Sequence, residues 1–110
     1  MNLNRDPKQV VLELLDRSVC SVQVSSCIVD CHNRIIAHGW NHVGDGYGQH
    51  AEMHALSRAN PNRLVGASIY VAAQRFRNKK IILSRPCEEC MPHLRGLTIW
   101  WRNKEGQWVR

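Results

Sequence analysis

One histidine and two cysteines, which can bind a metal, stand in two short segments of this 110-residue chain, and a glutamate follows the histidine closely. The first segment is His50-Ala51-Glu52, and the second is Pro86-Cys87-Glu88-Glu89-Cys90. An imidazole and two thiolates are ligands of suitable softness for Zn²⁺. Three protein ligands are typical of catalytic zinc sites, which keep a fourth position open, whereas structural sites normally have four. The two segments therefore predict a catalytic zinc centre with His50, Cys87 and Cys90 as ligands.

The carboxylate of Glu52 is the predicted acid and base, because it stands two residues after the first ligand. A carboxylate beside a metal-activated water can take its proton. Neighbouring positions on one helix face are three or four apart, so His50 and Glu52 converge only if His50 lies in an irregular first turn. We expect each metal-binding segment to begin a helix, whose N-terminus would lower the pKa of the thiols.

Two other interpretations of these residues agree less well with the sequence. His50 and His54 are four apart, as in a metalloprotease helix. That motif has glutamate directly after the first histidine, where this chain has Ala51. Cys87 and Cys90 could form a redox-active dithiol, but no thioredoxin-like strand leads into the pair. A catalytic zinc centre is the better hypothesis on both counts.

A structural zinc site completed by His93 or Cys31 is a further alternative, although it would leave Glu52 without a role. Cys27 and Cys31 could also start a second metal site. The expectation for Cys20, Cys27 and Cys31 is that they are small residues in or near the core.

The pattern H-x-E followed by P-C-x-x-C resembles that of the zinc-dependent cytidine deaminase-like superfamily, which includes dCMP, tRNA adenosine and APOBEC-type deaminases. The resemblance covers roughly residues 20–101. It implies an α/β fold of three layers, α/β/α, with a central mixed sheet of about five strands. It also implies Zn²⁺ on His50, Cys87 and Cys90, with Glu52 carrying the protons while water replaces the amine at C4 of cytosine.

Substrate contacts are implied at less specific positions. Asn41 matches an asparagine that contacts the sugar in several members, and Ser84 matches a position whose backbone contacts the base. Ala51, between the ligand and the acid, completes the substrate-binding set. The chain departs from the common pattern in its basic turn, residues 75–80, and in Arg85 before the proline. Because of these departures the identity of the substrate is not determined, whereas the identity of the metal is unaffected.

The elements that position these residues follow from hydrophobic periodicity and turn signals. A loop is expected over residues 39–48 and a turn at Gly106. Helices are expected over residues 6–17, from near residue 50 to a stop at Asn60-Pro61, and over roughly 88–95. Strands are expected over residues 20–30, 35–37, 67–73, 80–84 and 97–101. Helices alternating with strands predict a sheet covered by helices.

Length and composition place limits on the class of protein. The length suits one domain, residues 1–110. The longest apolar runs are a few residues, so no membrane span is expected, and residues 1–6 do not resemble a secretory signal. We therefore expect a cytoplasmic, intracellular protein with reduced thiols. Five cysteines, an odd number, argue against a complete disulfide framework.

The net charge of +6 indicates an anionic partner. Cations and aromatic rings together suit single-stranded nucleic acid, and the candidate contacts are Arg75, Arg77, Lys79, Lys80, Arg85, Trp100 and Trp101. Adjacent strand residues face opposite ways, so one tryptophan is expected in the core or in a self-association surface of a homo-oligomer.

Three functions remain at this point. The leading prediction is a deaminase that acts on cytosine in single-stranded nucleic acid. The second is a deaminase of free cytosine nucleotides or nucleosides such as dCMP. The third, of another class, is a zinc-stabilised nucleic-acid-binding domain without catalysis.

Overall fold

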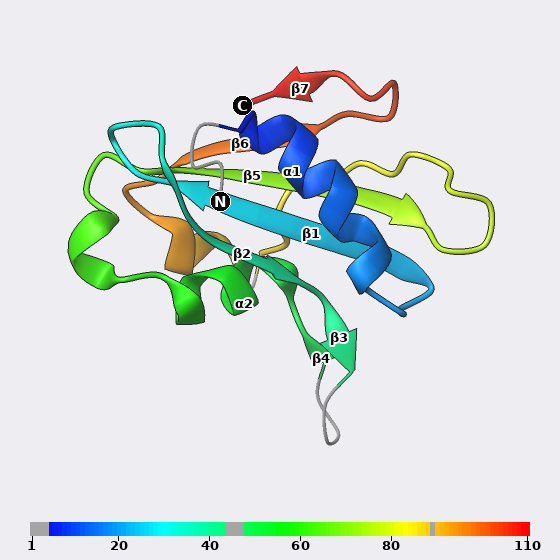
Figure 1. The fold of residues 1–110 in the computed structure, drawn as a ribbon. Helices are drawn as coiled ribbons and strands as arrows, with labels where there is room; N and C mark the ends of the chain where they lie inside the picture. The colour runs from blue at the N-terminus through cyan, green and yellow to red at the C-terminus, as the bar shows by residue number, and fades with distance from the viewer. Residues whose placement is uncertain (1–4, 44–47, 89) are drawn as a thin grey trace.

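The computed structural model describes residues 5–43, 48–88 and 90–110. Its helical elements are α1 (Pro7–Leu14), η1 (Leu15–Arg17), α2 (Ala51–Arg58), η2 (Pro61–Arg63) and η3 (Met91–Leu94), the three η segments being 3-10 turns. Its strands are β1 (Val22–Val29), β2 (Ile35–Trp40), β3 (His42–Val43), β4 (Gly48–Gln49), β5 (Ser68–Arg75), β6 (Thr98–Arg102) and β7 (Trp108–Val109). Figure 1 shows their arrangement.

A five-stranded mixed sheet forms the middle layer, with strand order β2-β1-β5-β6-β7. Strand β1 runs antiparallel to β2 and β5, β5 runs parallel to β6, and β6 runs antiparallel to β7. Helix α1 covers one face of this sheet, while α2 and η3 lie against the other (Figure 1). The predicted three-layer α/β/α fold is confirmed.

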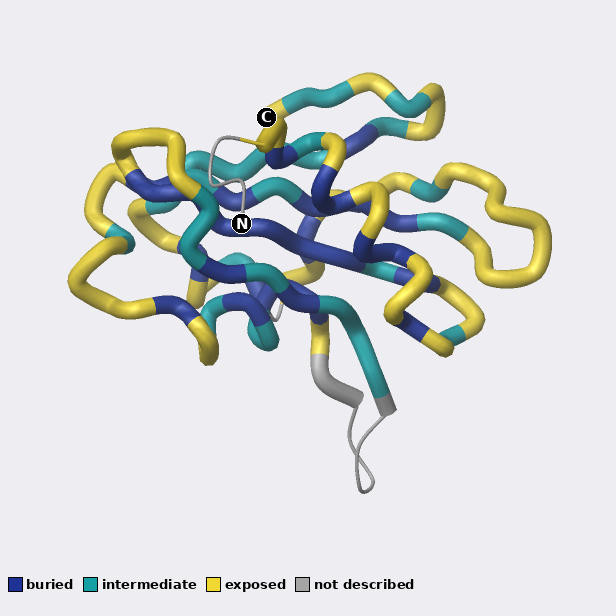
Figure 2. The backbone as a smooth tube through the Cα atoms, viewed as in Figure 1, coloured by how far each residue is buried: buried dark blue, intermediate teal, exposed yellow. Residues whose placement is uncertain are grey.

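The core consists of two apolar layers, one on each face of the sheet. Alternation along β1 creates them, because successive strand residues point to opposite faces. Ile28 packs in the layer that holds Ala55 of α2, whereas Cys27 packs in the layer that holds Val11 of α1. Figure 2 shows β1 as buried along most of its length.

The N-terminal helix and the first hairpin form where the sequence predicts them. The Asp6 carboxylate accepts a hydrogen bond from the backbone N–H of Lys8 at 3.0 Å, and Pro7 occupies the first turn of α1. Asn33 takes a positive φ of 64° in the hairpin turn, which asparagine tolerates better than most residues.

The expected strand over residues 80–84 is wrong. This segment makes one isolated bridge, between Gln74 and Ile81. It then crosses the sheet, because the Ile82 N–H donates to Ala73 of β5 and the Ser84 N–H donates to Arg102 of β6. A segment that changes partner within three residues cannot build a ladder. The fifth strand of the sheet is instead β7, which follows a turn at Gly106 (φ +83°).

The expected helix over residues 88–95 is also wrong, because only the 3-10 turn η3 forms there. Pro92 lies in its first turn, and Gly96, with φ +86°, follows soon after its end. The expected loop over residues 39–48 is partly corrected: Gly39 belongs to β2, and β3 pairs with β4. Residues 44–47 of that loop lie outside the described part of the chain.

None of the described helices is both long and apolar enough to cross a membrane.

Candidate metal centre and pocket

His50 lies at the boundary between an extended segment and helix α2. It is the N-cap of α2, with φ −73° and ψ 147°, so it does not follow the helical register. The irregular position that convergence with Glu52 requires is therefore present. The carbonyl of Ala51, the next residue, accepts a hydrogen bond from the Ser26 hydroxyl at 2.7 Å, which holds the start of the helix on β1.

The three predicted ligand atoms lie together. The Nδ1 of His50 is 3.2 Å from the Sγ of Cys90 and 3.3 Å from the Sγ of Cys87, and the two sulfurs are 3.6 Å apart. Tetrahedral zinc, with bonds of about 2.0–2.1 Å to nitrogen and about 2.3 Å to sulfur, separates its ligands by about 3.5–3.8 Å. The observed triangle is close to this size, so the donors fit Zn²⁺.

Within the described residues, no second group of three histidine, cysteine or acidic side chains is close enough to hold a metal. His93 and Cys31 are not part of the group. Cys27 is buried, as expected for a small core residue, whereas Cys31 is exposed and Cys20 is partly buried. Neither a closed four-ligand site nor a second site at Cys27 and Cys31 is therefore formed in this part of the chain.

A tight turn brings the two sulfurs to one side. The N–H groups of Cys90 and Met91 both donate to the carbonyl of Cys87, at 3.1 Å each. Burial raises the pKa of the Cys90 thiol, and the Glu52 carboxylate raises it further. The expected lowering of this pKa by a helix N-terminus is not seen for Cys90, where burial and Glu52 raise it. A bound cation would stabilise this thiol as a thiolate.

Glu52 lies in the first turn of α2 with a side chain that is almost fully buried. Burial raises the pKa of this carboxyl, while the helix N–H, His50 and Cys90 act in the opposite direction. A buried carboxyl with a raised pKa holds its proton more readily than an exposed one.

A pocket of about 230 Å³ opens beside these groups. It is smaller than the cavities of about 300–1,000 Å³ that hold drug-sized ligands, so it suits one small ring. Its residues come from β1, the position after β2, the start of α2, the end of β5 and the segment that leads to Cys87. They are Val22, Val24, Asn41, His50, Ala51, Glu52, Ala73, Ile82, Leu83, Ser84, Arg85 and Cys87. Among the apolar members only Ala51 was predicted from the sequence, and Val22, Val24, Ala73, Ile82 and Leu83 were missed.

Asn41 reaches the pocket, but its amide is largely engaged by the protein. The Oδ1 atom accepts from the Ser18 hydroxyl at 2.6 Å and from the Val24 N–H at 2.9 Å. The Nδ2 group donates to the Val22 carbonyl at 2.8 Å. An amide nitrogen has two N–H bonds, so one remains for a ligand.

Ser84 also reaches the pocket while its hydroxyl faces the sheet. The hydroxyl donates to the Val71 carbonyl at 2.7 Å and accepts from the Arg102 N–H at 2.8 Å. The Ser84 N–H donates to the Arg102 carbonyl at 3.0 Å. Ser84 therefore fixes the pocket wall to the middle of β5 and the end of β6, and its side chain is not free to bind a substrate.

The two adjacent tryptophans separate as expected for a strand. Trp101 pairs with Val71 of the α2 face, and the guanidinium of Arg85 lies 5.9 Å from its ring centre. Trp100 lies on the opposite face, where its ring is parallel to that of Tyr70 with 6.1 Å between centres. Trp101 and Arg85 are therefore near the pocket, while Trp100 is remote from it.

The basic turn is divided between two environments. The ammonium of Lys79 bonds to Asp16 at 3.1 Å and lies 4.9 Å from the centre of the Phe76 ring. Arg75, Arg77 and Lys80 instead line a hollow on the surface. Lys79 thus helps to hold the turn against η1, whereas the other three cations face solvent.

The sequence matches the family described as "Cytidine and deoxycytidylate deaminase zinc-binding region" over residues 4–100. The chain belongs to this deaminase family. No curated protein matches its sequence. Zn²⁺ is the cofactor that agrees with both the family and the His50, Cys87 and Cys90 group of the deaminase.

Two solved structures resemble the deaminase. Cytidine deaminase from Burkholderia pseudomallei aligns with a TM-score of 0.70 and 17% identity, over 94% of this chain and 87% of that one. Cytidine deaminase from Mycobacterium leprae aligns with a TM-score of 0.59 and 18% identity, over 92% and 88%. At such low identity the comparison establishes the fold of the deaminase alone.

Proposed function

We propose that this deaminase converts cytosine to uracil in single-stranded nucleic acid, with Zn²⁺ held by His50, Cys87 and Cys90 and protons carried by Glu52. The observation that carries the proposal is a buried carboxyl beside a three-ligand group at a pocket sized for one ring. A structural zinc domain without catalysis has no need of an acid buried at the rim of its metal site.

In the proposed reaction, Glu52 moves protons between the attacking water and the ring. When bound, Zn²⁺ lowers the pKa of a water molecule at its open position. The Glu52 carboxylate accepts a proton from the water as its oxygen bonds to C4 of cytosine. It delivers this proton to N3, then takes the second proton from the new C4 hydroxyl and passes it to the exocyclic amine. The C4–N bond breaks and ammonia leaves, so that cytosine and water become uracil and ammonia.

The walls of the pocket support a flat substrate ring. Val24, Ala73 and Ile82 line the pocket and would contact the ring faces. Because the hydroxyl of Ser84 is bonded to the sheet, polar recognition of the ring falls to backbone groups near it. The remaining N–H of Asn41 would be available to bind the sugar.

Arg85 supports a substrate that carries phosphate. It is exposed, it lines the pocket, and its guanidinium lies over Trp101 rather than in an ion pair with a described acid. Guanidinium groups bind phosphate through paired N–H donors. The same feature favours the second candidate, a free nucleotide such as dCMP, since one guanidinium suffices for one phosphate.

The test incubates zinc-loaded protein with single-stranded DNA and RNA oligonucleotides containing one cytosine and, in parallel, with dCMP. Mass spectrometry follows the gain of one mass unit as the amine is replaced by oxygen. Uracil in an oligonucleotide supports the proposal, and product from dCMP alone refutes it in favour of the free nucleotide. No product from any of them, with zinc bound, would favour the binding domain without catalysis.

A further inference from the structure

A second hollow with a positive rim continues from the catalytic pocket. Ile82 and Leu83 line both the pocket and a neighbouring hollow of about 400 Å³, whose other residues are Arg75, Lys80, Ile81 and Lys104. Arg75 and Lys80 also line the hollow of about 560 Å³ that contains Arg77. We call this combined surface, defined by Arg75, Arg77, Lys80, Lys104 and residues 81–83, the basic groove.

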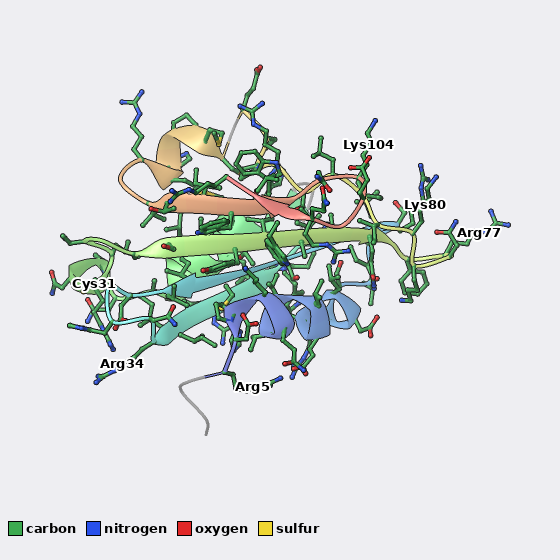
Figure 3. The ribbon with its side chains drawn as sticks, turned by 90° about the horizontal axis from the view of Figure 1, so that it is seen from above. Arg5, Cys31, Arg34, Arg77, Lys80 and Lys104 are labelled. Atoms are coloured by element: carbon green, nitrogen blue, oxygen red, sulfur yellow. The ribbon has the colours of Figure 1, made fainter. Side chains whose placement is uncertain are left out.

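The cations of the basic groove are available to a partner. Arg75, Arg77, Lys80 and Lys104 are exposed, and none forms an ion pair with any acidic residue that the structure describes. Arg77, Lys80 and Lys104 lie at one end of the molecule, opposite Arg34 (Figure 3). The acidic residue next to these cations in the sequence is Glu105, which follows Lys104. The groove therefore presents a net positive charge.

The floor of the basic groove is apolar although it faces solvent. Ile81 and Leu83 are 37% and 46% exposed. The segment crosses from β5 to β6 and leaves Ile81 and Leu83 uncovered. Exposed apolar side chains bordered by charges are a feature of binding surfaces.

We infer that the basic groove binds the part of a single-stranded nucleic acid that adjoins the target cytosine. This inference rests on the proposed function and names the path of its substrate. The four cations would contact phosphates, and Ile81 and Leu83 would contact the faces of bases. Residues 80–84, at about 3.3 Å per residue, extend over roughly 16 Å, which leads directly from the turn to the pocket.

An anionic strand fits this surface better than a lone phosphate does. The cations are distributed over residues 75–80 and at residue 104 rather than converging on one point of the catalytic pocket. A free nucleotide seated in that pocket would contact Arg85 and leave the groove empty. A single-stranded nucleic acid can contact both the distributed cations and the apolar side chains between them.

The test compares the double variant Lys80→Gln, Lys104→Gln with a control double variant, Arg34→Gln, Arg95→Gln, whose exposed side chains lie outside the groove. Binding of a labelled oligothymidylate, which cannot be deaminated, is measured by fluorescence anisotropy against salt concentration. Each lost phosphate contact reduces the slope of log K against log salt by about 0.7 for a single strand. The groove variant should reduce it by about 1.4, while the control should match the native protein.

Deamination assays of the same proteins separate the two proposals. Retained turnover of dCMP with weakened oligonucleotide binding in the groove variant supports the groove. Native oligonucleotide binding and turnover by that variant would refute the groove but leave the proposed function standing. Native protein that converts dCMP and neither binds nor converts oligonucleotides would refute the proposed function. A raised KM for dCMP in the groove variant would assign these cations to the phosphate of a free nucleotide instead.

Discussion

Replacing Gly39 with alanine should disturb both the fold and the metal centre. Gly39 lies in β2, at a point where α2 packs closely against the sheet. A Cβ at this position would lie 2.5 Å from the backbone nitrogen of Ala55, 2.7 Å from the carbonyl oxygen of Ala51 and 2.9 Å from the Cβ of His54. Since two of these atoms are backbone, no side-chain rotation relieves the contact. Restoring an ordinary 3.4 Å contact moves α2 by about 0.9 Å.

The size of this helix movement determines the expected losses of turnover rate and of stability. Helix α2 carries Glu52, and His50 is its N-cap, whereas Cys87 and Cys90 belong to another segment. A shift of about 1 Å at a catalytic centre costs roughly 100-fold in rate. Overpacking lowers the free energy of unfolding by about 1–3 kcal/mol, and we expect a clash with backbone atoms to lie at the upper end of this range. At about 4 °C per kcal/mol, Gly39→Ala should lower the Tm by about 12 °C.

The assay combines thermal unfolding followed by circular dichroism, zinc content by mass spectrometry and deaminase turnover. The control is Gly96→Ala, where an added methyl group would meet nothing within 4 Å but φ is +86°. It should lose about 1–2 kcal/mol through backbone strain alone and keep its zinc and turnover. If Gly39→Ala unfolds within about 2 °C of the native protein with unchanged kcat, a difference well below the shift expected from overpacking, the inferred close packing of α2 on β2 is refuted.

Two substitutions and one cysteine-labelling experiment give three further predictions. Glu52→Gln should lower kcat by about 10²–10⁴-fold while one zinc per chain remains, because Glu52 acts as acid and base rather than as a ligand. Loss of zinc from this variant would contradict the assignment. The control is Glu88→Gln, whose side chain is exposed. Ser84→Ala should cost about 2–3 kcal/mol in chemical unfolding, since it leaves the Val71 carbonyl and the Arg102 N–H without their partner, whereas exposed Ser57→Ala should change stability by less than about 0.5 kcal/mol. Burial raises the pKa of Cys27 to about 12, so at pH 8 roughly 10⁻⁴ of it is thiolate, and iodoacetamide should label exposed Cys31 far faster than Cys27 in peptide mapping. Equal labelling of the two cysteines in the folded protein would show that Cys27 is not enclosed.

Much of the fold was predictable because local signals and tertiary packing agree there. Asp6 and Pro7 begin α1 as their capping chemistry requires, and the β1–β2 hairpin forms at its expected turn. The failures lie where tertiary contacts override a local pattern. The apolar run at residues 81–83 has a strand-like composition, yet its backbone groups pair with two different strands. Short β7 has little pattern of its own and exists because β6 offers it an edge.

The sequence by itself determined the chemistry of the centre, because ligand type and acid type are properties of side chains. One histidine, two cysteines and one glutamate in two spaced motifs were enough to predict a zinc-dependent deaminase, and the family match agrees. Only the tertiary structure decided which other groups surround that chemistry. It turned the Ser84 hydroxyl into the sheet, paired Lys79 with Asp16 and left Lys104 beside an exposed apolar segment. These outcomes depend on contacts between segments far apart in the chain, which no local pattern contains.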